Sequence, residues 1–481
     1  MNAILYAIAS HARQETAAIA VSDEAGIWTY VDLLGAVSSL VQALGRQIEG
    51  APRPVAIRLP NSRAWVAVDL ALSAIGCISI PIADFCTDQQ VSALLEDSGA
   101  GWIIEPASDL SVGGALGFGI SIRKLETTEV HIHPGTAKVS YTSGSTSTPK
   151  GVCLSAKHQS DVANSIVDRY GGGYAGIHVP VLSLGVLLEN VAGLYPILLA
   201  GGHYRIVGAD AIGLSNPFRP DFSAMRTALS EARASSTILV PELLRGLLSR
   251  SNVSLPDMQL IAVGGSKVAP ELVVAARASG LPVYEGYGLT ECGSVVSVNA
   301  PGVDRPGTCG KPLSHVSVSI SKDGEVIVEG PAYCGYVGQA PHKGSVQTGD
   351  LGQIDSDGFL SITGRKKNII ITSFGRNISP EWIESELLLQ PEFAQAIVLG
   401  DGDAALFALL APSAPGIDLA AVQRAVDRTN GRLPAYAKIE SFRLIAPLSP
   451  ESGLVTANGR PRRDVIAEAY PPSINVGEIT A

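Results

Sequence analysis

Short apolar runs alternate with helical patterns over about the first 360 residues of the chain. This alternation is typical of a layered α/β domain, in which helices cover the faces of buried sheets. The strand predicted at residues 260–263 runs directly into Gly264 and Gly265. The other elements predicted in this part are strands at 55–59, 77–82 and 238–240 and helices at 65–75 and 242–249.

After Pro306 the pattern changes to short strands, predicted at 316–320, 325–329 and 359–362, joined by tight turns. A domain boundary is predicted near Gly364, because a separate α+β pattern follows it. That pattern consists of strands at 368–372, 394–399 and 406–411 and helices at 380–388 and 419–429. The sequence thus predicts a large layered N-terminal domain with mixed sheets, residues 1–363, and a small α+β C-terminal domain, residues 364–481.

Composition narrows the class of protein. A chain of 481 residues is too long for one compact core, and 46% hydrophobic with only 17% charged residues can bury large cores. The net charge of −10 argues against a nucleic-acid-binding protein. The six cysteines form no CxxC pair and no zinc-ligand spacing, which indicates reduced thiols in a cytoplasmic protein.

No segment of the sequence is predicted to cross a membrane. Residues 1–10 form a short apolar run without a basic leader, which indicates an amphipathic helix and not a signal peptide. The best candidate, residues 179–200, carries Glu189 and Asn190 at its centre and is interrupted by glycines and Pro196. Ionisable groups are costly inside a bilayer, so this segment is predicted to be buried core.

The most informative segment is the loop 142–150, which contains six hydroxyl side chains, one glycine and Lys150. Such a loop can offer backbone N–H groups, hydroxyl donors and a cation to a polyphosphate. It is not a Walker A loop, because Pro149 precedes the lysine where that motif has glycine. Composition alone leaves an ordinary Ser/Thr-rich turn as an equal alternative.

The wider pattern resembles the adenylate-forming superfamily, which includes acyl-CoA synthetases, adenylation domains of nonribosomal peptide synthetases, and luciferases. The loop resembles that family's phosphate-binding signature, and further motifs follow in the family's order. These motifs are Thr29-Tyr30 with 31–33, Gly264-Gly265-Ser266 before 270–272, the YGxTE-like segment 284–291, Thr348-Gly349-Asp350, the hinge segment 364–367, the segment 374–384, and Asn458-Gly459-Arg460. The resemblance covers nearly the whole chain and is closest to long-chain acyl-CoA synthetases.

The resemblance implies a role for each motif residue. Lys150, Thr290, Glu291 and Arg460 would be catalytic, with Glu291 holding Mg²⁺, a hard cation that prefers carboxylate and phosphate oxygens. Lys367 would be the pivot of a mobile C-terminal domain, and Gly375, which by itself also fits a plain turn, would line the thiol tunnel. The residues implied to bind ATP are Thr142, Ser143, Gly144, Ser145, Thr146, Gly264, Gly265, Ser266, Glu285, Gly286, Tyr287, Gly288, Asp350 and Arg365.

The implied reaction uses ATP and Mg²⁺ to activate a carboxylic acid. Its carboxylate attacks the α-phosphorus and pyrophosphate leaves, so no general base is required and catalysis depends on positioning and charge stabilisation. The acyl group then passes to a thiol of CoA, or alternatively to a phosphopantetheinyl carrier protein or an amine. A degenerate nucleotide-binding protein without turnover is a further alternative.

Two residues depart from the family's pattern. Ser147 stands where the phosphate loop usually has glycine, and a positive φ there would cost roughly 1 kcal/mol. Arg460 replaces the lysine that usually contacts the carboxylate and the α-phosphate; it keeps the charge but is a longer, planar fork. Since the other residues on the ATP side are retained, Arg460 is expected to support adenylation still.

The acid is predicted to be fatty or otherwise hydrophobic. Leu188 takes the position at which amino-acid-activating domains usually place an aspartate for the substrate's ammonium group. Together with Leu184 and Glu189 it is predicted to line the acyl pocket, and an apolar lining favours an acid without an α-amine. The same residues also fit an ordinary hydrophobic core.

Overall fold

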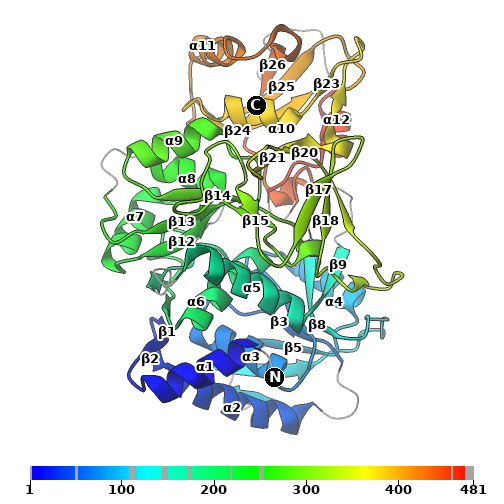
Figure 1. Ribbon diagram of the computed structural model, residues 1–481. Coiled ribbons are helices and arrows are strands. Elements are labelled where there is room, and N and C mark those ends of the chain that lie inside the picture. The colour runs from blue at the N-terminus through cyan, green and yellow to red at the C-terminus, as the bar shows by residue number, and fades with distance from the viewer. Residues whose placement is uncertain are drawn as a thin grey trace.

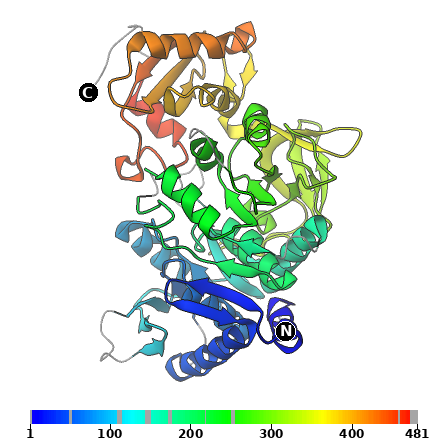
Figure 2. The same ribbon diagram turned by 90° about the vertical axis from the view of Figure 1, so that its left-hand side faces the viewer.

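The chain folds into a large body and a smaller lobe stacked on it (Figures 1 and 2). The computed structural model describes residues 3–48, 53–107, 114–142, 150–171, 176–216, 219–248, 254–456 and 459–471. The elements that follow β21 (Leu360–Arg365) and the turn η4 (Lys366–Asn368) make up the upper lobe in Figure 1. The predicted fold class, a large mixed α/β part with a small α+β part, is confirmed; the boundary near Gly364 stays a prediction.

A nine-stranded sheet forms the centre of the body, in the order β16-β15-β14-β13-β12-β10-β11-β1-β2. Its middle strands are parallel, and antiparallel pairs close both ends. The strands are β1 (Ile19–Asp23), β2 (Gly26–Thr29), β10 (Ile177–His178), β11 (His203–Arg205), β12 (Ser236–Leu239), β13 (Leu260–Val263), β14 (Val283–Tyr287), β15 (Ser297–Val298) and β16 (Lys311–Pro312).

The side chains of β13 alternate between two hydrophobic cores, as the pleat of a strand requires. Ile261 and Val263 pack into the core beneath α7 (Phe222–Glu231), α8 (Pro241–Leu248) and α9 (Pro270–Ala278). Leu260 and Ala262 face the opposite core. That second core is built with α5 (Ala156–Tyr170), the π-helix η2 (Leu188–Leu194) and α6 (Tyr195–Ala200).

An eight-stranded sheet lies below, in the order β19-β9-β8-β4-β3-β5-β7-β6. Its strands are β3 (Val55–Ile57), β4 (Ser79–Pro81), β5 (Trp102–Pro106), β6 (Ala115–Gly117), β7 (Ile120–Lys124), β8 (Thr136–Thr142), β9 (Lys150–Ser155) and β19 (Gly335–Tyr336). The helices of this region are α1 (Ala3–Gln14), α2 (Tyr30–Gln47), α3 (Arg63–Ala74) and α4 (Asp88–Ser98). A capping box between Thr29 and Asp32 begins α2, which fixes where β2 ends.

The segment after Pro306 forms a four-stranded antiparallel sheet, as its turn-rich pattern predicts. It consists of β17 (Ser317–Ile320), β18 (Glu325–Glu329), β20 (Val346–Ile354) and β21. The sequence did not predict β20, because threonine and two glycines interrupt its apolar residues. β20 and β21 pair so that Asp350 lies opposite Arg365.

The upper lobe is a three-stranded sheet, β24 (Phe393–Leu399), β25 (Leu406–Pro412) and β26 (Ile439–Leu444), packed on α10 (Pro380–Leu387) and α11 (Leu419–Asn430). A short hairpin of β22 (Ile370–Ile371) and β23 (Asn377–Ile378) and the helix α12 (Arg463–Ala469) complete it. Ser379 directly precedes α10, and its hydroxyl donates to Glu381 and caps no backbone N–H of the helix.

Residues 179–200 are core, as predicted. They break into a loop, η2 and α6, and both Glu189 and Asn190 are fully buried. Among the described residues, none of the helices has the length and apolar character that crossing a bilayer requires.

A buried ionic cluster ties β8 to three helices. The ammonium of Lys138 donates to both carboxylate oxygens of Asp69, at 2.9 and 3.1 Å, and to Asn190. The hydroxyl of Tyr195 donates to Asp69 at 2.6 Å. Burial lowers the pKa of the Lys138 ammonium and the Asp69 carboxylate opposes that shift, so each charge depends on the other. The cluster anchors the strand that leads into the loop 143–149.

We predict that Lys138→Met lowers the free energy of unfolding by about 3–5 kcal/mol, because it leaves the Asp69 carboxylate buried without its cation. Urea denaturation measures this change. Lys124→Met, at the exposed end of β7, is the control and should stay within about 0.5 kcal/mol of the parent. A loss below about 1 kcal/mol in Lys138→Met would show that Asp69 does not depend on Lys138.

Candidate active site

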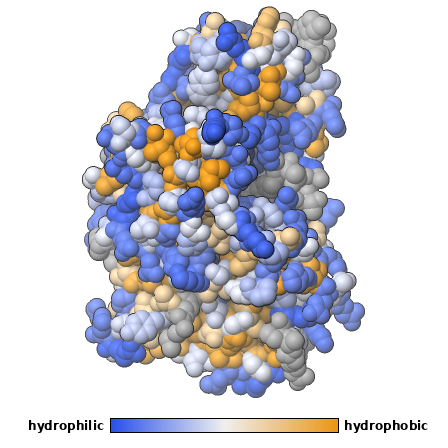
Figure 3. Space-filling model, turned by 45° about the vertical axis from the view of Figure 1, so that its right-hand side comes forward, coloured by the Kyte–Doolittle hydropathy of each residue, from blue (hydrophilic) through white to orange (hydrophobic). Residues whose placement is uncertain are grey.

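A cleft of about 3100 Å³ runs between the body and the upper lobe and continues into the body. The cleft is lined by the carboxyl ends of β13 and β14, by the strands β20 and β21, and by residues 455–456 and 459–463 of the upper lobe. Figure 3 shows that the hollow between the two parts is bordered mostly by hydrophilic residues. Segments far apart in the sequence therefore meet at one site.

Three predicted nucleotide-binding residues meet on one wall of the cleft. The Tyr287 hydroxyl donates to Asp350 Oδ2 at 2.7 Å, and Arg365 Nε lies 3.0 Å from Asp350 Oδ1. Burial raises the pKa of Asp350, and the Arg365 guanidinium acts against that shift. A carboxylate held between a cation and a hydroxyl donor still has lone pairs to accept bonds from a diol.

Glycines bring the ends of β13 and β14 close together. A Cβ on Gly264 would lie 2.9 Å from the carbonyl oxygen of Gly286, and one on Gly288 would lie 1.7 Å from that of Ser294. Gly265 has a φ of +88°, which favours glycine. Gly264, Gly265, Ser266, Gly286 and Gly288 all line the cleft. The narrow, flat wall that they form leaves room for a planar ring.

The predicted metal ligand Glu291 also lines the cleft, in the 3₁₀ turn η3 (Thr290–Cys292). Its Oε1 accepts a hydrogen bond from the Tyr336 hydroxyl at 2.8 Å, and its backbone carbonyl accepts one from the Tyr333 N–H at 2.9 Å. Lys150 lies nearby, with its ammonium 5.2 Å from the centre of the Tyr336 ring. Thr290 also lines the cleft.

The described residues contain no cluster of three or more His, Cys, Asp or Glu side chains arranged to hold a metal ion by themselves. A single carboxylate in an open cleft nevertheless suits Mg²⁺, which keeps several waters and takes other ligands from substrate phosphates. Glu291 therefore fits a magnesium ion that arrives with a nucleotide.

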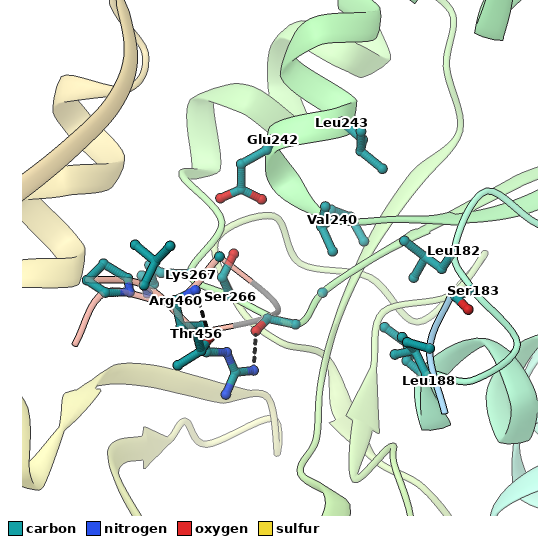
Figure 4. Close-up of a pocket in the computed structure, with 18 of the residues that line it drawn as sticks. Leu182, Ser183, Leu188, Val240, Glu242, Leu243, Ser266, Lys267, Thr456 and Arg460 are labelled. Carbon is teal, nitrogen blue, oxygen red and sulfur yellow. Dashed lines mark hydrogen bonds between the residues drawn. The ribbon is translucent and has the colours of Figure 1, made fainter. Parts of the chain in front are cut away.

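Arg460 reaches the cleft from the upper lobe. The Arg460 guanidinium donates to the carbonyl oxygen of Gly265 at 2.9 Å. The backbone N–H of Arg460 donates to the Thr456 hydroxyl at 3.1 Å (Figure 4). Arg460 keeps part of its surface exposed, but desolvation by the protein around its guanidinium and the nearby Arg365 lower its pKa, whereas Asp350 and Glu291 raise it. The residue that departs from the family's lysine thus touches the predicted nucleotide wall.

The remaining predicted residues fall in three groups. Lys367 lines the cleft, where burial and the positive charges of Arg365 and Lys150 lower its pKa. Gly375 is exposed at the tip of the β22–β23 hairpin and does not line the cleft. The phosphate-loop residues Ser143, Gly144, Ser145, Thr146 and Ser147, together with Asn458, lie outside the described residues. Thr142 ends β8 opposite Lys150, and its side chain is likewise not described.

The acyl-pocket prediction differs from the structure in part. Leu188 lines the cleft, but Leu184 and Glu189 are fully buried and do not. Glu189 faces the core because it accepts hydrogen bonds from His178 at 3.0 Å and Tyr204 at 2.8 Å. An ungapped count along the chain could not detect the π-helix, which alters the rotation of successive side chains.

Several apolar residues that the sequence did not single out line the inner part of the cleft. They are Ile166 and Tyr170 of α5, Ala192 of η2, Ile238 of β12, Leu260 and Ala262 of β13, and Val240 and Leu243 around the start of α8. The alternation of Leu260 and Ala262 immediately before Gly264 was the available signal, since alternate strand residues share one face.

Glu285 is buried beside the glycine wall, with 5% of its surface exposed. One carboxyl oxygen contacts the Cys309 thiol at 3.6 Å, and the other has no hydrogen-bond partner among the described residues. Burial raises the pKa of Glu285 from 4.5 to about 7, and the Lys267 ammonium only partly opposes this. The folded protein therefore holds a proton here that the unfolded chain releases.

Because the folded pKa is the higher one, Glu285 stabilises the fold fully below about pH 4.5 and loses that contribution as the pH rises to about 7. We predict that Glu285→Gln removes this dependence, so that the variant gains about 2–3 kcal/mol relative to the parent between about pH 5 and pH 8. Urea unfolding at both pH values measures the difference. The exposed Glu329→Gln should show none, and a gain of equal size there would contradict the assignment.

Comparison with known proteins places this chain in a family. The chain is 31% identical over 242 residues to the long-chain-fatty-acid–CoA ligase FadD15 of Mycobacterium bovis, a match that covers 44% of this chain and only 40% of that protein. It is 26% identical over 410 residues to the 2-succinylbenzoate–CoA ligase of Bacillus subtilis, covering 78% of this chain and 80% of the relative.

Solved structures show the same fold. The o-succinylbenzoate CoA synthetase of Bacillus subtilis, in complex with its acyl-adenylate intermediate, superposes with a TM-score of 0.79 at 24% identity, over 98% of this chain and 99% of that one. The anthranilate CoA ligase AuaEII, in complex with anthranoyl-AMP, gives 0.82 at 18% identity, over 96% of both chains. Residues 8–337, more than half of the chain, match the sequence model of the AMP-binding enzymes. The resemblance seen in the motifs is confirmed: this chain belongs to the AMP-binding enzyme family.

Proposed function

We propose that this protein activates a hydrophobic carboxylic acid with ATP and Mg²⁺ to an acyl-adenylate and transfers the acyl group to the thiol of CoA. The observation that carries the proposal is that Glu291, Asp350, Arg365 and Arg460 line one cleft, although they come from four separate segments. Family membership and the names of the relatives support the same chemistry.

In this proposal the nucleotide occupies the cleft between β14 and β20. The adenine ring lies against Tyr287 and the Gly264-Gly265 backbone. Asp350 accepts hydrogen bonds from the ribose hydroxyls, and the Arg365 guanidinium balances the negative charge of the Asp350 carboxylate. Thr290 donates to a phosphate oxygen. Glu291 would hold the Mg²⁺ that comes with the nucleotide, and that ion would supply positive charge to the phosphates. The motif's resemblance to the family assigns the phosphate contacts to Ser143, Gly144, Ser145 and Thr146, with Thr142 and Lys150 at the ends of the loop.

The chain's own residues then act by position and charge. The substrate carboxylate is already anionic, so the site needs no base to attack the α-phosphorus. Arg460, at the Gly265 carbonyl, lies where the acid must meet the nucleotide and orients the carboxylate while balancing negative charge that builds up on the phosphorus. The guanidinium fork suits this role because it can bond two oxygens at once.

The inner part of the cleft provides the acid's binding site. Apolar side chains of Leu182, Leu188, Val240 and Leu243 lie across the cavity from Ser266 and Arg460 (Figure 4). Farther in, one wall is the face of the central sheet, where Ile238 and Tyr284 flank Ala262 on the neighbouring strands. The opposite wall is α5 and η2. A polar entrance and an apolar interior fit a carboxylate with a hydrocarbon body.

The register of β13 sets the depth of this channel. Leu260 begins the strand and Gly264 follows its end, so an acyl chain laid along it in this proposal spans about 13 Å at about 3.3 Å per residue. With C–C bonds of about 1.5 Å, an extended hydrocarbon chain of about ten carbons spans that length. Tyr170, whose hydroxyl donates to the Asn299 carbonyl at 3.1 Å, stands on the α5 wall.

The second step of the proposed reaction transfers the acyl group from the adenylate to an acceptor. A turn of the upper lobe about Lys367 would bring Gly375 to the cleft and form the thiol tunnel. The relatives' names favour CoA as the acceptor. A carrier-protein thiol or an amine remains the alternative, and a nucleotide-binding protein without turnover is the other.

We predict acid-dependent ATP–pyrophosphate exchange with saturated acids, with an optimum near about ten carbons because an acyl chain laid along β13 spans about 13 Å. A graded panel of fatty and aromatic acids, read with CoA, holo-carrier protein and amines as acceptors, measures both steps. If only aromatic acids supported exchange, the proposal of a fatty-acid substrate would be wrong. Nucleotide binding without exchange for any acid would favour the protein without turnover.

Channel variants should shift that profile in opposite directions. Ala262→Leu fills the channel, so exchange with acids longer than about six carbons falls at least about tenfold while short acids are retained. Leu260→Ala opens its inner end, so longer acids gain, an effect that misfolding cannot produce. Ile261→Val, on the opposite face of β13, is the matched control and should leave the profile unchanged. Identical profiles in all variants would place the acid elsewhere.

Arg460→Ala is expected to lower acid-dependent exchange by about 100-fold, as for other donors that stabilise transition-state charge, while ATP binding changes little. Arg460→Lys should stay within about tenfold of the parent. The neighbouring Arg462→Ala, whose side chain donates to the Gly453 carbonyl, is the control. Unchanged exchange in Arg460→Ala would remove Arg460 from the reaction.

A further inference from the structure

Tyr336 lies between the two oppositely charged groups expected to meet the metal and the phosphates. Its hydroxyl donates to Glu291 Oε1 at 2.8 Å, while the face of its ring lies 5.2 Å from the Lys150 ammonium. Among the residues that the structure describes, Lys150 and Glu291 form no ion pair with each other. One phenol therefore contacts both charges and separates them.

The two contacts of Tyr336 reinforce each other. A cation is attracted to the electron-rich face of an aromatic ring. Donating the hydroxyl proton toward a carboxylate polarises the phenol and increases the electron density of that ring. A phenol is protonated at neutral pH, so the hydroxyl of Tyr336 is available as a donor to Glu291.

The backbone around Tyr336 is held firmly. β19 pairs with β9 so that Tyr336 lies opposite Val152, two residues from Lys150. The Tyr336 carbonyl lies 3.0 Å from His133 Nε2. Gly335 has a φ of +146°, and a Cβ there would lie 2.3 Å from the same nitrogen. Glycine at this position lets the strand approach His133, which fixes the direction in which the tyrosine points.

A neighbouring aromatic group supports the ring. Tyr333 packs against Tyr336 with ring centres 5.0 Å apart and stacks on His342 at 4.5 Å. The Tyr333 N–H also donates to the Glu291 carbonyl. The segment 333–342 therefore holds both the backbone and the side chain of Glu291.

We propose that Tyr336 is a positioning residue that keeps Glu291 and Lys150 apart and ready for a magnesium–nucleotide complex; this rests on the proposed function. Without the phenol, a flexible lysine and a nearby carboxylate would pair with each other, and that pair would have to break before metal and phosphate bind. Holding the two charges apart in advance removes that cost from the binding step. It also leaves Glu291 Oε2 free of the tyrosine's hydrogen bond for the metal.

The test is a magnesium titration of nucleotide binding, which does not depend on turnover. The probe is a fluorescent, non-hydrolysable ATP analogue, read in EDTA and at increasing Mg²⁺. In Tyr336→Phe the ring stays over Lys150 but the hydroxyl is lost, so affinity in EDTA stays within about twofold. The Mg²⁺ concentration at half-maximal binding should rise about three- to tenfold, because the variant loses one hydrogen bond to a charged group. Tyr336→Leu should weaken binding in EDTA as well, because Lys150 is then free to pair with Glu291.

Tyr6→Phe, at an exposed tyrosine of α1 that does not line the cleft, is the control and should leave the magnesium dependence unchanged. In a Glu291→Gln background, adding Tyr336→Phe should cause no further change, because the tyrosine acts through that carboxylate. Thermal unfolding of each variant separates a folding defect from a local one.

Equal magnesium dependence in Tyr336→Phe and the parent, or an additive effect in the Glu291→Gln background, would overturn the proposal. A parent protein that binds no magnesium–nucleotide complex would overturn the proposed function as well, whereas one that binds it without activating any acid would overturn only the latter.

Discussion

The architecture of the site depends on one buried carboxylate, Asp350, held between Tyr287 and Arg365. Tyr287 ends β14 of the central sheet, whereas Asp350 and Arg365 lie opposite each other on two strands of the four-stranded sheet. A charge removed from water must be compensated where it lies, so these strands are fixed relative to each other at this point. The upper lobe follows Arg365 directly, and its position over the cleft therefore begins from this contact.

Apart from the Asp350–Arg365 pair, the charged residues Arg460, Lys150 and Glu291 line the cleft without forming ion pairs with one another among the described residues. Arg460 bonds the neutral Gly265 carbonyl although Asp350 and Glu291 lie close enough to influence its pKa. Lys150 and Glu291 are separated by the ring of Tyr336. Charges that are held but not paired are the arrangement that a highly charged ligand such as a triphosphate requires.

The division between polar and apolar chemistry follows from the pleat of β13. Beyond its carboxyl end, Gly264 and Gly265 present backbone to the nucleotide side, and within it Ala262 and Leu260 present small and apolar surfaces to the channel. Ile261 and Val263 face the other core and stabilise the strand. One strand thus lines the polar and the apolar parts of the cleft and packs into the hydrophobic core.

Much of this could be read from the sequence, because the signals were local. Apolar runs predicted β3, β13, β18 and α8 within a few residues, and the ordered motifs identified the family before any geometry was known. Short-range patterns carry this information because strand and helix periodicities depend on neighbouring residues.

Only the tertiary structure decided which of those residues meet. Glu189 looked like a pocket residue, but the π-helix turns it toward His178 and Tyr204, while Ala262 and Tyr170 line the channel from elements far apart in sequence. The contact of Tyr336 with Glu291 spans a separation of 45 residues and leaves no local pattern. The sequence by itself determined the family and many of the elements, and the nucleotide-binding residues that its motifs name stay a prediction. Packing between distant segments decided the shape of the acid's channel and the pairing of charges, because those contacts depend on which faces the assembled sheets bring together.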